Sequence, residues 1–187
     1  MTAPILTPGA AMSDRIYNEW AHIYRALGLE PRPVTPGTKA AKLRGWQKPD
    51  TEIGQRIVES WDDKYRAFGI GLRMGTPLPG GGRLGALDID HDSYVRPMEG
   101  LLGKIVSGRI GSKGAVIFVR VMGDLPNSKF KVKGEAGAEY GQVVECLFNK
   151  TFCVIPPTIH PDTNQPYRWI GTPLHEVDFS LLPRIGA

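Results

Sequence analysis

The sequence predicts an α+β fold whose sheet is mixed or antiparallel, and three observations support this prediction. Amphipathic helical spacing dominates the first third of the chain. One strand–helix–strand unit follows, and beyond it the periodic segments alternate with the period of a β-strand. Helices that precede strands in this way are typical of α+β proteins, whereas a doubly wound sheet needs strands and helices in alternation.

Two helices are expected in the N-terminal part of the chain. Residues 14–28 carry apolar side chains at helical spacing, and Gly28 ends the pattern. Residues 51–63 repeat this spacing after a capping threonine. Between them, the Pro/Gly-rich basic segment 31–46 is expected to be a loop with room for one short extended piece.

The second half of the chain is expected to consist mainly of strands. One further helix is predicted over residues 93–106, and the segment 156–169 is too rich in proline for regular structure. The expected strands span residues 67–75, 83–90, 108–113, 115–122, 129–133, 141–147 and 151–155.

The composition excludes several classes of protein. A chain of 187 residues, of which 41% are hydrophobic and 22% charged, fits one folded domain or two small lobes. No window contains the ~20 consecutive apolar residues of a membrane helix, and the first residues lack the pattern of a secretion signal. Two cysteines are too few for a disulfide framework or a four-ligand zinc site. We therefore expect a cytoplasmic protein that does not contact a membrane.

The net charge of +4 is unevenly distributed. Residues 15–48 hold seven Lys or Arg and two acids, and residues 104–133 hold seven and one, so these segments carry +5 and +6. The rest of the chain therefore carries −7. Such segregation is typical of a protein that binds a polyanion and gathers its carboxylates for another task, although uneven solvated charge gives the same count.

The segment 84–90, LGALDID, ends in two carboxylates. Because side chains alternate along a strand, Asp88 and Asp90 share one face, while Leu87 and Ile89 share the other. Neighbouring carboxylates become favourable when a divalent cation lies between them, and oxygen ligands of this kind suit Mg²⁺ or Mn²⁺. The alternative is a pair of solvent-facing acids at the end of a strand.

Glu145 is the third candidate carboxylate, because it interrupts the otherwise apolar strand 141–147. A charge at such a position is either at a sheet edge or committed to a partner, since burying an unpaired charge is costly. If this strand pairs with the Asp88 strand, three carboxylates meet on one face of the sheet. Two-metal phosphoryl or nucleotidyl transfer requires such an arrangement.

Residues 109–114, RIGSKG, are a candidate phosphate contact. The two glycines allow close approach of the backbone, Ser112 supplies a hydroxyl and Lys113 supplies a point charge. The spacing is not that of a Walker A loop, and a strand rather than a helix follows. An ordinary basic hairpin turn has the same composition.

The segment 156–169 combines polar, aromatic and rigid residues. His160 is a candidate donor to a phosphate or a ribose, and Tyr167 and Trp169 are candidates for stacking on a base. Taken singly, a loop histidine is more often an ordinary surface residue, and a tryptophan is more often part of the core.

Together these segments resemble the bifunctional DNA primase/polymerase N-terminal domain of the archaeo-eukaryotic primase superfamily. The similarity covers residues 14–172 and rests on four stretches in order: LDID, GSKG running into IFVR, VVEC, and VIPPTIHPDTNQPYRW. The resemblance implies a catalytic lobe with a sheet like that of an RNA-recognition motif, packed with a small N-terminal α/β lobe. The expected divisions are a flexible N-terminus (1–13), an N-terminal lobe (14–75), a catalytic sheet lobe (76–172) and a C-terminal tail (173–187).

The resemblance also implies roles for single residues. Asp88 and Asp90 would form the first acidic motif and Glu145 the third, so that these catalytic carboxylates hold two Mg²⁺ or Mn²⁺ ions. In many relatives the middle motif reads Ser-x-His, and its histidine touches the phosphates of the incoming nucleotide. Here the matching stretch is Ser112-Lys113-Gly114-Ala115-Val116, which contains no histidine. Either Lys113 or His160 is expected to do the same electrostatic work.

We therefore expect template-directed transfer of a dNTP or NTP to the 3′-hydroxyl of a primer on single-stranded DNA. The residues expected to bind the nucleotide are Ser112, Lys113, Arg120 and His160. Those expected to bind template phosphates without reading sequence are Lys39, Lys42, Arg44, Lys129, Lys131 and Lys133. Relatives often continue into a helicase or a helical primase C-terminal region, so such a partner on the same or another chain is expected.

Two other functions remain open. The absence of the motif histidine favours a replication-initiator or single-stranded nucleic-acid-binding module that has lost catalysis. The same carboxylates also suit a metal-dependent nuclease, which shortens a strand, whereas a polymerase lengthens it.

Overall fold

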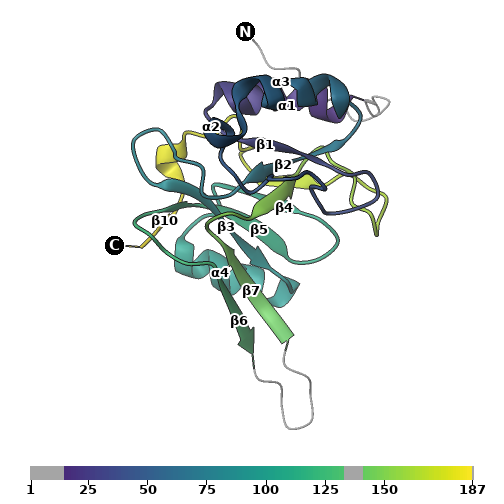
Figure 1. Ribbon diagram of the computed structural model, residues 1–187. Coiled ribbons are helices and arrows are strands. Elements are labelled where there is room, and N and C mark those ends of the chain that lie inside the picture. Colours follow the sequence, from purple (N-terminus) through teal and green to yellow (C-terminus); the bar gives the residue numbers. More distant parts are fainter. Residues whose placement is uncertain (1–14, 133–140, 187) are drawn as a thin grey trace.

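A computed structural model describes residues 15–132 and 141–186, and it confirms the expected α+β class. The strands form a large seven-stranded sheet and a small three-stranded sheet. Figure 1 shows the N-terminal helices at one end, the small sheet beneath them, then the large sheet with α4 beside it. The expected flexible N-terminus, residues 1–13, lies outside the described residues.

The α-helices are α1 (Ile16–Ala26), α2 (Asp50–Ile53), α3 (Gln55–Lys64) and α4 (Val95–Leu102), and the 3₁₀ turns are η1 (Asp92–Tyr94) and η2 (Phe179–Leu181). The strands are β1 (Pro31–Val34), β2 (Gly69–Arg73), β3 (Arg83–Ile89), β4 (Ser107–Ile110), β5 (Ala115–Val121), β6 (Ser128–Val132), β7 (Gly141–Leu147), β8 (Phe152–Ile155), β9 (Arg168–Gly171) and β10 (Arg184–Ile185). No helix in these two described ranges has the length and apolar character needed to cross a lipid bilayer.

Two helix predictions were wrong in extent, and glycines explain both. The helix expected over 51–63 is split into α2 and α3, because Gly54 between them has a φ of +93°. The helix expected over 93–106 begins with the 3₁₀ turn η1 and ends at Leu102, because Gly103 has a φ of +81°. Only glycine adopts such positive φ values readily, and an α-helix cannot continue through them.

All seven predicted strands are present, as β2–β8, and differ at their ends; β1 is the short extended piece allowed in the segment 31–46, whereas β9 and β10 were not predicted. The expected strand 108–113 ends at Ile110, where the glycine-containing turn to β5 begins. The segment 156–169 is largely irregular, as expected, but its last two residues begin β9, which pairs with β4.

The small sheet has the order β1–β2–β8 and draws strands from both halves of the chain. β8, from the expected catalytic lobe, completes the sheet that β1 and β2 begin in the N-terminal lobe. The expected tail 173–187 likewise joins the core: Leu174 and Leu182 are buried, and β10 runs parallel to β5. The two lobes are therefore interleaved along the sequence.

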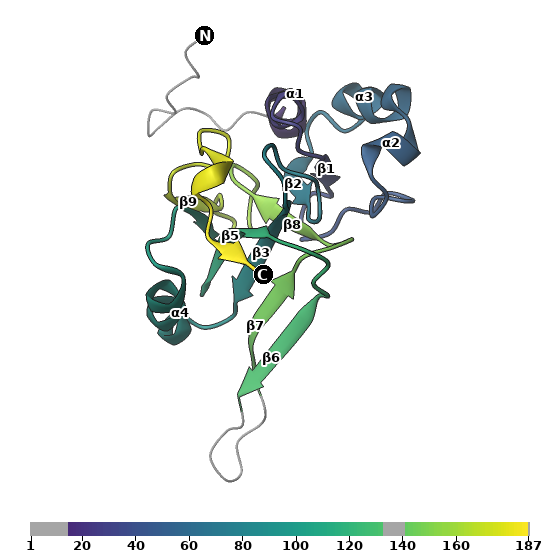
Figure 2. The ribbon, with the colours of Figure 1, turned by 90° about the vertical axis from the view of Figure 1, so that its left-hand side faces the viewer.

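The large sheet has the order β6–β7–β3–β5–β4–β9, and its two faces are covered differently. One face, which includes Ala86 and Phe118, shares a core with the small sheet and α1. The other face, which includes Leu87 and Ile117, packs against α4. As Figures 1 and 2 show, the hairpin of β6 and β7 extends away from the body of the protein.

Candidate active site

Two of the predicted carboxylates face each other across neighbouring strands. Asp88 on β3 pairs directly with Glu145 on β7 in the antiparallel register. The same row continues to Lys129 on β6 in one direction, and to Val116 on β5 and Arg109 on β4 in the other. Directly opposed residues have Cβ atoms about 4.5–5.5 Å apart, so these five side chains form one line across one face of the sheet.

Asp90 joins the carboxylate pair just beyond the end of β3. Its backbone N–H donates to the carbonyl of Val143 at 3.0 Å, so the strand pairing continues past Ile89 and keeps Asp90 on the face of Asp88. The side-chain amide of Gln142 donates to Asp90 Oδ2 at 2.9 Å and to Glu145 Oε2 at 3.3 Å. A single NH₂ group therefore links two of the three carboxylates.

The electrostatic environment couples these acids. Burial raises the pKa of the Asp88 carboxyl above its ordinary value, the guanidinium of Arg109 opposes this rise, and the charges of Asp90 and Glu145 add to it. Asp88 is thus a carboxylate whose ionised form is stabilised when a cation approaches.

The chemistry of this cluster fits a hard divalent cation, because Mg²⁺ and Mn²⁺ prefer carboxylate oxygens. Across residues 15–132 and 141–186, however, no group of three or more His, Cys, Asp or Glu side chains is arranged to hold a metal ion. Glu145 is bound instead by the Gln142 amide and by Lys129, whose Nζ lies 3.2 Å from Glu145 Oε1. An ion held by all three carboxylates requires these side chains to turn toward it.

A cavity of about 120 Å³ lies beside the carboxylates. Its walls come from the end of β3, the β4–β5 turn, the segment between β1 and α2, and the loop between β8 and β9. The residues predicted from sequence that line it are Lys39, Asp88, Asp90, Ser112, Lys113, His160 and Tyr167. The structure therefore brings together the acidic motif and three of the four predicted nucleotide contacts.

The β4–β5 turn is held against the end of β3 at Gly114. Its backbone N–H donates to Asp92 Oδ1 at 2.6 Å, and its φ is +59°. A Cβ at this position would overlap the carbonyl oxygen of Ile89, so only glycine permits the close approach. This contact fixes the position of Ser112 and Lys113, both exposed, relative to the carboxylates.

His160 presents one ring nitrogen to the cavity. The ring is buried, and Nδ1 accepts a hydrogen bond from the backbone N–H of Asp162 at 3.2 Å. In the neutral ring the proton is therefore on Nε2, which faces Gly111 in the β4–β5 turn. Burial lowers the pKa of His160, and the charge of Lys39 lowers it further. At neutral pH the ring is consequently a neutral hydrogen-bond donor.

Arg109 is a cavity residue to which the sequence analysis gave no role. Its guanidinium carbon lies 4.5 Å from the centre of the Tyr167 ring, and its Nη2 lies 3.8 Å from Cys153 Sγ. The only feature of the sequence that could have indicated a role for Arg109 was its place in a short strand just before the glycine-containing turn. Its proximity to Asp88 depends on the order of the strands, which periodicity does not reveal.

The two aromatic candidates for base stacking lie in the interior. Tyr167 is 3% exposed and lies under Arg109, and burial raises the pKa of its hydroxyl to about 12. Trp169 is partly buried against the main core, with its ring centre 6.1 Å from that of Phe118. Both rings pack between the site and the interior of the protein, so neither offers an open face on which a base could stack.

Arg120, the fourth predicted nucleotide contact, lies elsewhere. It is four residues along β5 from Val116, about 13 Å at 3.3 Å per residue, and pairs with Leu84 near the start of β3. Its Nε and Nη2 donate to the carbonyls of Gly81 and Pro79 at 2.7 and 2.9 Å. Arg120 thus fastens the turn that precedes β3, and the structure does not bring it to the cavity.

The predicted template-binding residues lie on two sides of the carboxylates. Lys39 lines the cavity, with Nζ 3.0 Å from Asp162 Oδ2, and Lys129 lies beside Glu145 on the far side. The exposed members of the set are Lys39, Lys42 and Arg44 between β1 and α2, and Lys129 and Lys131 on β6. Lys133 lies outside the described residues.

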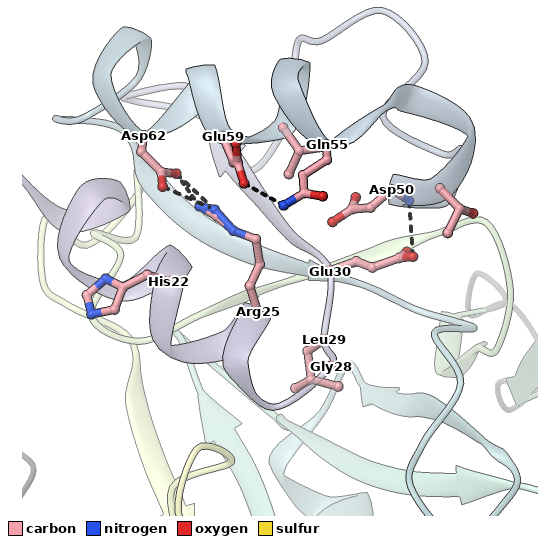
Figure 3. A pocket seen from close by; sticks show the side chains of 11 residues that line it. His22, Arg25, Gly28, Leu29, Glu30, Asp50, Gln55, Glu59 and Asp62 are labelled. Carbon is pink, nitrogen blue, oxygen red and sulfur yellow. Dashed lines mark hydrogen bonds and ion pairs between the residues drawn. The ribbon is translucent and has the colours of Figure 1, made fainter. Parts of the chain in front are cut away.

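A larger cavity, of about 780 Å³, lies between α1 and the helices α2 and α3 (Figure 3). Its charged side chains are already paired with each other or with neighbours. Arg25 is ion-paired with Asp62, and the carboxylate of Glu59 accepts a hydrogen bond from Gln55 at 2.7 Å. Because its polar groups are satisfied, this cavity offers less for a charged ligand than the smaller one beside Asp88.

Comparison with known protein families identifies one match. The model of the family described as "Bifunctional DNA primase/polymerase, N-terminal" matches residues 21–184. This range contains the three carboxylates, the β4–β5 turn and the loop that carries His160. No curated protein matches the sequence significantly.

Proposed function

Because the chain belongs to the bifunctional DNA primase/polymerase N-terminal family, we propose that it catalyses template-directed nucleotidyl transfer with two divalent ions. The family membership implies a primase/polymerase type of enzyme that acts on nucleic acid and nucleotides. The observation that carries the proposal for this chain is the register of β3 and β7, which sets Asp88 opposite Glu145 at the edge of a cavity lined by cationic groups.

The carboxylates have a defined role in this proposal. Asp88, Asp90 and Glu145 would hold Mg²⁺ or Mn²⁺ ions through their oxygen atoms. When bound, such ions lower the pKa of the attacking 3′-hydroxyl and neutralise charge on the leaving pyrophosphate. The protein orients the carboxylates through the β3–β7 pairing and the bridging amide of Gln142.

The cavity would bind the triphosphate of the incoming nucleotide. Lys113 supplies charge, Ser112 a hydroxyl and His160 a neutral Nε2–H donor, and all three line the cavity. These groups are positioned before the substrate arrives, so they stabilise the charge that develops on the phosphate oxygens without reorganisation. This supports the expectation that Lys113 and His160 do the work of the missing motif histidine.

The exposed cations on both sides of the site would bind the template. Lys39 lines the cavity, Lys42 and Arg44 follow it in the same exposed segment between β1 and α2, and Lys129 and Lys131 lie on the extended β6–β7 hairpin. Such contacts to phosphates provide salt-dependent affinity without sequence specificity. A helicase or helical primase region on the same or another chain stays a prediction.

The large sheet also supports a likeness to the RNA-recognition motif. Five elements of this lobe occur along the chain in the order β3, α4, β4, β5 and β7. Their strands lie in the sheet in the order β7–β3–β5–β4. That is the strand order 4-1-3-2 of such a motif, with β6 standing between β5 and β7 where its second helix would be. Asp88 and Glu145 then lie on strands 1 and 4 of the motif, which are neighbours in the sheet.

The direct test is incorporation of labelled dNTP or NTP into a primed single-stranded DNA template with Mg²⁺ or Mn²⁺. We expect the wild-type protein to lengthen the primer and the double variant Asp88→Ala/Asp90→Ala to lose this activity. Unimpaired synthesis by the double variant would falsify the proposal. Shortening of the labelled strand would identify a nuclease instead.

One observation favours a second function, a single-strand-binding module without catalysis. The three carboxylates are not arranged to hold a metal ion in the described part of the chain, and the stretch that matches the Ser-x-His motif, Ser112-Lys113-Gly114, contains no histidine. Tight single-strand binding by the wild-type protein, with neither nucleotide binding nor synthesis in Mn²⁺, would select this function.

A further inference from the structure

The guanidinium of Arg109 is poorly supplied with hydrogen-bond acceptors. An arginine carries five N–H donors and stays charged at any pH that a folded protein experiences. Among the described residues, the Nε of Arg109 is enclosed without any partner, and the Nη2 has only the sulfur of Cys153 at 3.8 Å. A thiol is a weak acceptor, and the face of Tyr167 offers attraction to charge but no lone pair.

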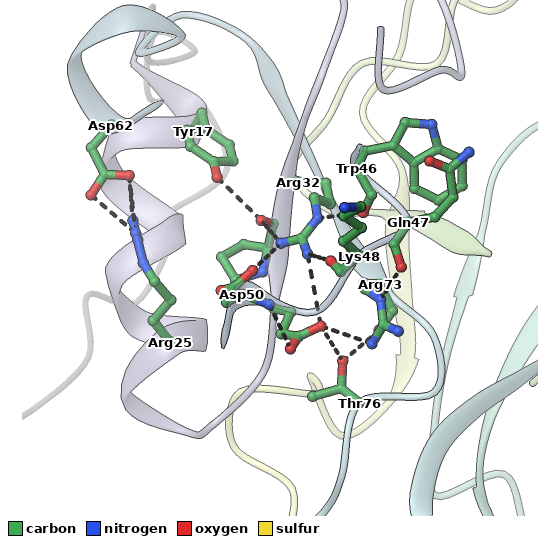
Figure 4. Close-up of polar contacts among 12 residues, drawn as sticks. Tyr17, Arg25, Arg32, Trp46, Gln47, Lys48, Asp50, Asp62, Arg73 and Thr76 are labelled. Atoms are coloured by element: carbon green, nitrogen blue, oxygen red, sulfur yellow. Dashed lines mark hydrogen bonds and ion pairs between the residues drawn. The ribbon is translucent and has the colours of Figure 1, made fainter. Parts of the chain in front are cut away.

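The buried arginines elsewhere in the chain show what a satisfied guanidinium looks like here. Arg32 donates to the carbonyls of Trp46 and Lys48 at 2.8 and 2.7 Å and to Asp50 at 2.7 Å, as Figure 4 shows. Arg73, in the same view, donates through its Nε to a carbonyl at 2.7 Å and through its Nη1 to a carboxylate at 2.9 Å.

Arg120 follows the same rule, with two carbonyl acceptors at 2.7 and 2.9 Å. In each of these three arginines the Nε donates to an oxygen atom, and each guanidinium holds a loop or an acid in place. Arg109 departs from the pattern, although its surroundings are equally enclosed at Nε. Leaving such donors unpaired lowers stability, so a structural role does not account for this residue.

The position of Arg109 indicates the missing acceptor. It lines the cavity with Lys39, Lys113 and His160, so four donor groups line one small space of about 120 Å³. Two acids, Asp88 and Asp90, line the same cavity as these donors. The cavity has hydrogen-bond donors on one side and carboxylates on the other. This arrangement fits an anion that accepts hydrogen bonds through some of its oxygen atoms and contacts a carboxylate-bound cation through the others.

We propose that Arg109, laid flat on Tyr167, binds a phosphate oxygen of the incoming nucleotide's triphosphate, an inference that rests on the proposed function. The planar guanidinium matches the geometry of two phosphate oxygens, whereas an ammonium acts as a point charge. Stacking on the buried ring of Tyr167 holds this plane at a fixed angle before the ligand arrives. Arg109 on β4 and His160 in the loop before β9 thereby supply contacts to the anion. β5 supplies none beside Arg109, because the residue paired with Arg109 on that strand is Val116.

Two consequences distinguish this role from a structural one. The proposed hydrogen bonds to phosphate come from side chains other than the carboxylates. We therefore expect the cavity to bind inorganic tripolyphosphate without a divalent ion. Replacement of Arg109 by methionine removes an enclosed Nε without a partner, but also the attraction between its charge and Asp88, so we expect the unfolding midpoint to change little. Replacement of a structural arginine such as Arg32 should lower the midpoint markedly.

The test measures binding of inorganic tripolyphosphate by calorimetry in the presence of a chelator, for the wild-type protein and the variants Arg109→Met and Arg109→Lys. We expect Arg109→Met to weaken binding by at least about tenfold and Arg109→Lys to weaken it by less. Arg168→Met is the matched control, because Arg168 pairs with Ile110 in the neighbouring register position and is exposed on the opposite face of the sheet. The control should bind as the wild type does.

A parallel arm measures binding of a single-stranded oligonucleotide, which carries phosphates but no triphosphate. Unchanged tripolyphosphate affinity in Arg109→Met overturns the inference, as does a loss confined to the oligonucleotide. A marked fall in its unfolding midpoint also overturns it, because that result assigns Arg109 to the fold. Failure of the wild-type protein to extend a primer, with Arg109-dependent binding of tripolyphosphate intact, would instead count against the proposed function alone.

Discussion

Asp88 on β3 and Glu145 on β7 stand directly opposite each other, so the fold holds two carboxylates together at a distance where each repels the other. Burial raises the pKa of Asp88, and the charge of Glu145 contributes to that rise. A pair of this kind lowers the stability of the free protein. Its position at the edge of a cavity with cationic walls is consistent with the role we propose for it in binding divalent ions.

The first prediction concerns Asp88→Asn. The substitution keeps the shape of the side chain and removes a charge that burial and two neighbouring acids disfavour, so we expect the free energy of unfolding to rise by about 1 kcal/mol at neutral pH. Primer extension should fall by at least about a hundredfold. Urea denaturation and an incorporation assay measure the two effects. Asp124→Asn is the control, since that carboxylate is 92% exposed and should change neither quantity.

A second prediction follows from the direction of the Asp88 shift. A carboxyl whose pKa is raised in the folded state loses its favourable contribution to stability as the pH rises through that pKa, because the fold must then hold the charge. Ion binding needs the ionised form, so Mn²⁺ affinity should fall as the pH is lowered through the same value. Arg109→Met removes the main influence that lowers this pKa and should move the transition to higher pH. A transition that stays in place in this variant would contradict the assigned coupling.

The third prediction separates two roles of Lys129. Its ammonium lies 3.2 Å from Glu145 Oε1 and competes with a divalent ion for this carboxylate. Lys129→Gln should therefore bind Mn²⁺ up to about fivefold more tightly, since an exposed ion pair contributes at most about 1 kcal/mol. The same variant should bind single-stranded DNA more weakly, with a salt slope reduced by about 0.7. Lys131→Gln should share the second effect without the first, as fluorescence anisotropy and Mn²⁺ titration can establish.

The fourth prediction concerns the β4–β5 turn. Gly114→Ala places a methyl group against the carbonyl of Ile89 and should lower the free energy of unfolding by about 2 kcal/mol or more, while moving Lys113 away from the carboxylates. Gly123→Ala is the matched control, because its φ of +70° is similar and nothing lies within 4 Å of its Cβ. The control should lose only about 1 kcal/mol, the cost of a left-handed alanine. Equal losses in the two variants would show that the contact with Ile89 has no effect.

The fifth prediction tests the small sheet. Arg32 is fully buried and paired with Asp50 at 2.7 Å, so Arg32→Met leaves this acid without its partner. We expect a loss of about 3–5 kcal/mol in chemical denaturation. Protein that remains folded should still bind tripolyphosphate, since Arg32 is not among the residues of the cavity beside Asp88.

Local pattern was sufficient to predict the positions of the main helices, seven of the ten strands and the shared face of Asp88 and Asp90, because alternation along a strand is a property of the backbone. It was not sufficient to predict the position of Arg120. This side chain lies on the same face of the sheet as Asp88, but at the far end of β5. Periodicity specifies the face of a sheet on which a side chain lies, and register decides how far along the strand it lies.

The sequence by itself determined the α+β class and the likeness to primase/polymerases, and it supplied the candidate residues of the acidic motif and the glycine-rich turn. Tertiary structure alone decided which of them meet. The order of the strands set Glu145 beside Asp88 and Arg109 two strands away, and the loop before β9 folded back to add His160 and Tyr167. The physical reason is that pairing between strands far apart in the chain depends on the burial of two sheet faces at once, and no local stretch of sequence encodes that burial.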